Sequence, residues 1–130
     1  MTQIQFEPEF REVLLDRVLP ISPDYAVRHF IAVLGKFGGV LDDYSAERVT
    51  WINGSAHLMV FGEDEADAGR AHLFGAIFCT PTGDSSLIQI LRYSENENIP
   101  GGTHDMLKRV ARSIISITLG HAAADEFMKT

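Results

Sequence analysis

The sequence predicts one α+β domain over residues 1–130, with an antiparallel sheet of about five meander strands. Two observations carry this prediction. Short apolar stretches in the middle of the chain are separated by turn residues, which join neighbouring strands as antiparallel hairpins. Segments with apolar residues at helical spacing lie on both sides of this region, towards the two ends of the chain. The composition, 45% hydrophobic and 22% charged, is that of an ordinary globular domain.

The two N-terminal elements are predicted as a helix or strand, followed by a helix. Residues 8–19 fit helical spacing, and they also fit the alternation of a strand, apart from Arg17. We favour the helix. The second element is clearer, because Ser22 can cap a helix and Pro23 suits its first turn, where no backbone N–H is needed. The glycines at 38 and 39 then provide a stop signal.

The middle of the chain carries the strand signals. Asn53-Gly54 is the strongest of them, because the tight turn of a hairpin needs positive φ angles that these two residues tolerate. Polar and turn-forming residues separate the other apolar stretches. The five predicted strands cover residues 40–44, 48–52, 55–61, 71–80 and 86–93.

The C-terminal element is predicted as a helix that begins at Thr103. Leu107, Val110 and Ile114 belong to an apolar stripe along one side of it. Gly120 is expected to bend or break the element, because glycine is a poor helix former.

Hairpin turns determine which residues lie opposite each other, so the two faces of the sheet can be predicted. The Asn53-Gly54 turn places Thr50 beside His57, and the loops that follow place His57 beside Ala76. Ala76 is in turn expected beside Gln89. Together with Asp43, these residues form a polar row across a face that is otherwise rich in apolar side chains. The small side chain of Ala76 leaves room in this row.

This second face is the candidate binding surface, because an apolar surface with a few convergent polar groups is typical of a ligand or partner site. The other face, which carries Trp51 and Cys79, is expected to pack against the helices and to bury both side chains. The residues predicted to bind a ligand or partner are Asp43, Thr50, His57, Met59, Phe61, His72, Phe74, Ala76, Gln89 and Tyr93.

Charge and motifs argue against several classes of function. The net charge of −7 disfavours nucleic-acid binding, and no apolar run approaches the roughly 18 residues of a membrane span. A single cysteine excludes a multi-thiolate zinc site, and the expected registers place His57 and His72 about 13 Å apart. We therefore expect no metal, no cofactor and neither nucleic acid nor membrane among the partners.

The sequence thus predicts a noncatalytic binding or interaction module in which the second face takes a small hydrophobic ligand, a protein partner or a second copy of the chain. One alternative is a small enzyme of the isomerase, cyclase or hydrolase type, with His57 as a weak catalytic candidate that shuttles a proton. Another is a chaperone- or immunity-like protein-binding domain. The N-terminus has no charged and apolar leader, so a cytoplasmic location is expected.

Overall fold

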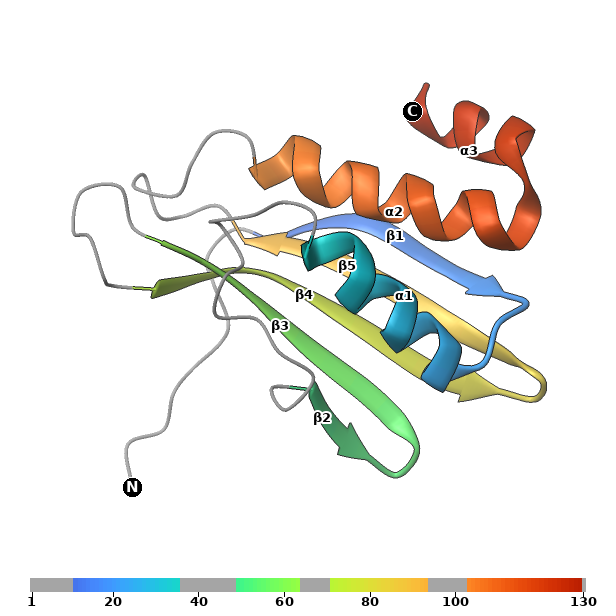
Figure 1. The fold of residues 1–130 in the computed structure, drawn as a ribbon, viewed down its shortest axis with the longest axis horizontal. Helices are drawn as coiled ribbons and strands as arrows, with labels where there is room; N and C mark the ends of the chain where they lie inside the picture. The colour runs from blue at the N-terminus through green and yellow to red at the C-terminus, as the bar shows by residue number, and fades with distance from the viewer. Residues whose placement is uncertain (1–10, 36–48, 64–70, 94–102, 130) are drawn as a thin grey trace.

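The computed structural model describes residues 11–35, 49–63, 71–93 and 103–129 and shows an α+β domain. Five antiparallel strands form a single sheet in the order β1-β5-β4-β3-β2 (Figure 1). In chain order the elements are β1 (Arg11–Leu19), α1 (Pro23–Gly35), β2 (Val49–Ile52), β3 (Ser55–Glu63), β4 (Ala71–Thr82), β5 (Ser85–Tyr93), α2 (Thr103–Leu119) and α3 (His121–Met128).

The first element is a strand, so the favoured helix was wrong and the strand alternative is confirmed. β1 pairs with β5, which lies about seventy residues further along the chain, and completes one edge of the sheet. A β-bulge between Val13 and Leu15 shifts the register there, so that Leu15 and Leu19 are buried on the helix side. Pairing with a distant strand therefore overrides the helical spacing of these residues. The predicted strand at residues 40–44 lies outside the described residues.

The predicted hairpin at Asn53-Gly54 is confirmed. Both residues have positive φ angles, 53° and 83°, and Thr50 pairs with His57 as expected. The β4–β5 hairpin is tighter than predicted: β4 continues to Thr82, and Gly83 turns the chain with φ 62°. The capping role of Ser22 is also confirmed, because its hydroxyl accepts a hydrogen bond from the Tyr25 N–H at 3.3 Å.

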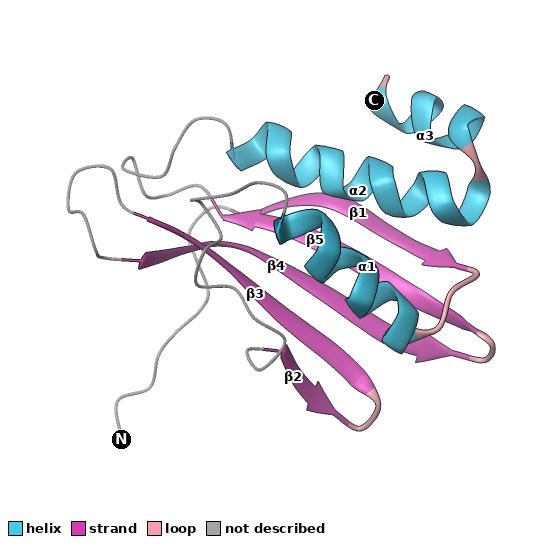
Figure 2. Ribbon diagram, viewed as in Figure 1, coloured by secondary structure: helices cyan, strands magenta, loops and turns pink. Residues whose placement is uncertain are grey.

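Helices α1 and α2 pack against the same face of the sheet (Figure 2). The core between them and the sheet is formed by alternate strand residues such as Leu58, Ile77 and Ile90 and by Phe30 and Leu107 of the helices, all fully buried. Because only alternate residues of a strand point into this core, the residues between them point to the opposite face.

The chain reverses at Gly120, whose φ of 97° favours glycine, and α3 then packs against α2. The predicted break at Gly120 is confirmed. Trp51 was expected in the core, but its side chain is 46% exposed. Although Trp51 pairs with Ala56 on the helix side of the sheet, it lies on the edge strand β2, for which the described helices provide little cover.

Candidate functional site

The candidate site is the face of the sheet opposite α1 and α2, which we call the open face (Figure 1). No described helix lies on it. Strand alternation and the backbone pairings place the following described side chains on it: Val13, Asp16, Val18, Thr50, Ile52, Ser55, His57, Met59, Ala76, Phe78, Thr80, Thr82, Ser85, Leu87, Gln89 and Leu91.

A continuous row of side chains crosses the middle of the open face. Thr50 pairs with His57 and His57 with Phe78; Gln89 lies next to Phe78 on β5. Asp16 of β1 pairs with Gln89 and ends the row at the opposite edge of the sheet. The row therefore has a threonine at one end, a carboxylate at the other, and an aromatic ring at its centre.

This row corrects the predicted one. His57 was expected beside Ala76 and Ala76 beside Gln89, but both registers are shifted by two residues, so that Phe78 pairs with both His57 and Gln89. Between β4 and β5 the shift arises because both strands extend further into their hairpin than predicted. Between β3 and β4 it arises because Ala71 pairs with Glu63 instead of Gly62 and because a β-bulge follows Val60. A shift of two keeps the described side chains on their predicted faces and changes only their neighbours.

Phe78 fills the place that a small residue was expected to leave open. Its ring makes an edge-to-face contact with the His57 imidazole, with ring centroids 5.0 Å apart and an interplanar angle of 83°. Ala76 instead pairs with Met59 and Leu91, and it is fully buried among apolar neighbours. The predicted gap between His57 and Gln89 is therefore absent.

The remaining predicted site residues are less well defined. Thr50, His57, Met59, Ala76 and Gln89 do share the open face. Asp43 lies outside the described residues. The other four belong to strands, but their side chains also fall outside the described part: Phe61, His72, Phe74 and Tyr93. Phe61 pairs with Leu73 instead of His72, because a β-bulge follows Val60.

The open face is apolar at its centre and partly exposed at its margins. Ala76 and Leu91 are buried there, with Met59 and Phe78 packed against them, in a cluster separate from the main core. At the outer strands, Val13, Val18 and Ile52 are 53%, 49% and 49% exposed. Half-exposed aliphatic side chains at both margins leave apolar surface that a partner could cover.

His57 does not form a catalytic pair with Asp16, the carboxylate of its row that the structure describes. Asp16 lies three strands away, about 14 Å at the usual strand spacing, which is too far to orient the imidazole. The ring contact with Phe78 holds His57 in place by packing. On the other face, burial raises the pKa of the Cys79 thiol from 9.0 to about 12, which keeps it protonated and unreactive at neutral pH.

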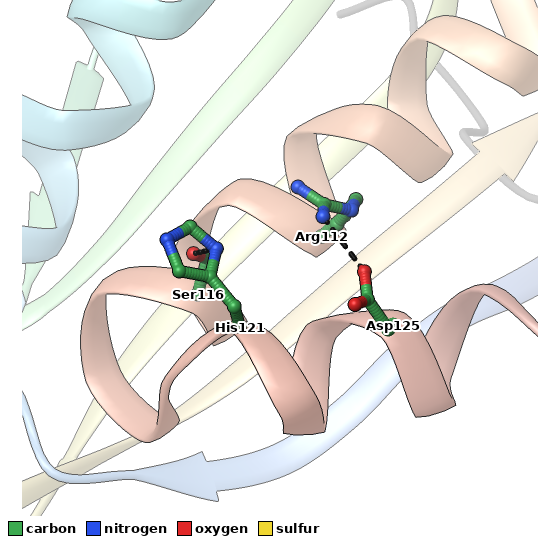
Figure 3. A network of polar contacts seen from close by, with 4 residues as sticks. All are labelled: Arg112, Ser116, His121 and Asp125. Atoms are coloured by element: carbon green, nitrogen blue, oxygen red, sulfur yellow. Dashed lines mark hydrogen bonds and ion pairs between the residues drawn. The ribbon is translucent and has the colours of Figure 1, made fainter.

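A polar network that the sequence did not predict joins α2 to α3 (Figure 3). Arg112 Nη2 donates to Asp125 Oδ1 at 2.9 Å, and Ser116 Oγ lies 3.1 Å from His121 Nδ1. Asp125 bonds to the arginine and not to His121, so these residues do not form a nucleophile–base–acid chain. The sequence signal for this network is weak, because its members approach only after the chain reverses at Gly120.

The same region contains a hollow of about 430 Å³ next to this network, and Ser113 within it hydrogen-bonds to His29 of α1 at 2.9 Å. The hydrogen bonds tie the three helices together. The residues that line the hollow are Arg109, Arg112, Ser113, Ser116, Ile117 and Met128.

Comparisons with known proteins assign no family, since no family model, curated protein or solved structure matches the chain. In the part of the chain that the structure describes, no helix is both long and apolar enough to cross a membrane. Nor do the described residues bring three His, Cys, Asp or Glu side chains together as metal ligands.

Proposed function

We propose that this protein is a noncatalytic interaction domain that binds a protein partner on its open face. The observation that carries the proposal is that α1 and α2 both pack on one side of the sheet, whereas apolar side chains continue across the other. Half-exposed Val13, Val18 and Ile52 extend this apolar surface to both edges of the sheet. A surface of this kind is typical of a protein interface.

A broad protein surface fits the open face better than a small hydrophobic ligand does. Small-molecule sites are concave and enclose most of the ligand, whereas Phe78 occupies the one gap that the sequence predicted on this face. Two hollows lined by described residues lie away from this face: one is beside α3, and the other, of about 560 Å³, adjoins Tyr25 and Thr118.

The partner is expected to gain binding energy mainly from apolar contact. A fully buried valine or isoleucine side chain contributes about 1.5–3 kcal/mol relative to an exposed one. Val13, Val18 and Ile52 are already half-buried, so covering each of them adds about 1 kcal/mol. A cytoplasmic location, in which a free cysteine such as Cys79 stays reduced, is part of the proposal.

The accessibility of a cysteine placed on the open face tests this function. Ile52→Cys puts a thiol on the face, and Ala32→Cys puts one on the exposed side of α1 as a matched control. Native Cys79 is buried, so it should not react with a thiol reagent in the folded protein. In dilute protein, we expect a maleimide to label both introduced cysteines at comparable rates.

The proposal is contradicted if Ile52→Cys stays unlabelled in a protein that sedimentation velocity shows to be monomeric, while Ala32→Cys reacts and the variant keeps its native circular dichroism. The face would then be covered by the chain itself and could not bind a partner.

A further inference from the structure

We infer that the partner of the open face is a second copy of this chain, related to the first by a twofold axis that runs along β4. This inference rests on the proposed function and names its partner. It comes from the order of residues in the central row: when a second copy of the sheet is turned over onto the first, the two rows face each other with complementary side chains.

The central row of one copy is complementary to the central row of a second copy that runs in the opposite order across the sheet. A twofold axis along β4, between two facing sheets, keeps the level of each residue along the strands and exchanges β1 with β2 and β5 with β3. Asp16 of one copy then faces Thr50 of the second copy, and Gln89 faces His57. Each of these pairs can hydrogen-bond: the threonine hydroxyl donates to the carboxylate, and the imidazole N–H donates to the amide oxygen.

The neighbouring rows match in the same way. Leu91 on β5 and Met59 on β3 both pair with Ala76, so they lie at the same height along the strands. Leu91 of one copy therefore faces Met59 of the second copy across the axis. Val18 on β1 and Ile52 on β2 lie towards the same end of the sheet and meet at its margins. Half-exposed Val18 and Ile52 therefore cover each other.

The other twofold arrangement is unfavourable. An axis across the strands, along the central row, would place each residue of that row against its own copy. The Asp16 carboxylates would then face each other at the interface, and a close pair of like charges is destabilising. Charge therefore favours the axis along β4 over an axis along the central row.

The size of the face is also suited to a dimer. Four strands of at least nine residues and the four residues of β2, at about 4.8 Å spacing and about 3.3 Å per residue, give a face of about 630 Å². A standard stable interface buries about 600–1,000 Å² on each partner. Facing sheets cross at about 30°, which displaces the outer strands by about 5 Å, within the reach of their side chains.

A charge-reversal pair tests the arrangement by sedimentation velocity. We expect the wild-type protein to be dimeric at micromolar concentration. Thr50→Asp places a carboxylate opposite Asp16 of the second copy and should weaken the dimer at least tenfold. The double variant Thr50→Asp with Asp16→Lys should restore it, because opposite charges then face each other. Asp24→Lys, exposed on α1, is the control and should leave the dimer unchanged.

A second measurement tests the axis itself. Thr80 lies on β4, so the axis brings the two copies of this residue face to face. Thr80→Cys should therefore be linked between chains by a bismaleimide that spans the roughly 10 Å between packed sheets. The control variant Ala32→Cys should not be linked.

Failure of this inference can be told apart from failure of the proposed function. A protein that stays monomeric at high micromolar concentration, with Ile52→Cys labelled at all concentrations, overturns the second copy as partner and leaves the open face available to another protein. A dimer that is insensitive to Thr50→Asp overturns the axis along β4. An Ile52→Cys thiol that never reacts, in a monomer, overturns both.

Discussion

The close approach of β4 to α2 at Gly75 permits a quantitative test of the one-sided helix packing. A Cβ atom at this position would lie 2.9 Å from Leu107 Cδ1 and 3.1 Å from the Leu91 carbonyl oxygen. Leu107 is fully buried, and the carbonyl belongs to the backbone of the adjacent strand, which cannot easily shift. Added methyl groups in a packed core cost about 1–3 kcal/mol. We expect Gly75→Ala to lower the free energy of unfolding by about 2 kcal/mol.

Gly35→Ala is the matched control. No atom lies within 4 Å of a Cβ at Gly35, and its φ is not in the left-handed region. The substitution should be neutral or stabilise the protein by up to about 1 kcal/mol, because alanine restricts the unfolded chain. Urea denaturation followed by far-UV circular dichroism measures the free energy of unfolding of both variants, which can be compared directly when their m-values are equal.

A double-mutant cycle isolates the contact between the two residues. Leu107→Ala alone should cost about 2–5 kcal/mol, because it leaves a cavity in the core. The methyl group of Gly75→Ala would partly occupy that cavity, so the double variant should lose less than the sum of the two single losses by at least about 0.5 kcal/mol. Strict additivity, or a Gly75→Ala variant as stable as Gly35→Ala, would refute the packing of α2 on β4 at this point.

Three further predictions concern the core and the α2–α3 contact. Ser86→Ala should lower the urea midpoint by the equivalent of about 1–2 kcal/mol, because it removes a fully buried hydroxyl that donates to the Ile21 carbonyl at 2.6 Å; an unchanged midpoint would contradict this. Burial raises the pKa of the Cys79 thiol from 9.0 to about 12, so between these pH values the thiol ionises in the unfolded chain but stays protonated in the folded protein. The free energy of unfolding should therefore fall by about 1.4 kcal/mol per pH unit between pH 9 and 12, whereas this thiol causes no loss below pH 9. Denaturation measured across that range should show this slope for the wild-type protein and not for Cys79→Ala. Arg112→Gln should cost less than about 1 kcal/mol, because its bond to Asp125 is largely solvent-exposed; a thermal-unfolding loss above about 2 kcal/mol would show that α3 depends on it.

The features that the sequence predicted correctly depend on local chemistry. Asn53-Gly54 forms its turn because both backbones adopt positive φ, and that turn alone determines the pairing of Thr50 with His57. Ser22 caps α1 for a similarly local reason. The break at Gly120 follows from the conformational freedom of one residue.

The errors in the candidate site arose where a local signal was ambiguous. The turn residues around Thr80-Pro81 suggested an early end to β4, but the strand continues to Thr82 and Gly83 makes the turn. This places Phe78, and not Ala76, beside Gln89. The pairing of Glu63 with Ala71 and the β-bulge after Val60, neither of which the sequence indicated, place Phe78 beside His57 as well. For the described side chains the predicted faces were right and these neighbours wrong, because alternation has a period of two and does not detect a shift of two.

Local patterns in the sequence are enough to predict the α+β class, the faces of the described central side chains and the hairpin at Asn53-Gly54, because alternation and turn chemistry act between near neighbours. The three-dimensional structure was needed to show that β1 is a strand beside β5, which places Asp16 at the end of the central row. It also decided that α1 and α2 share one side of the sheet. Both outcomes depend on contacts between residues far apart in the chain, where burial outweighs local preference.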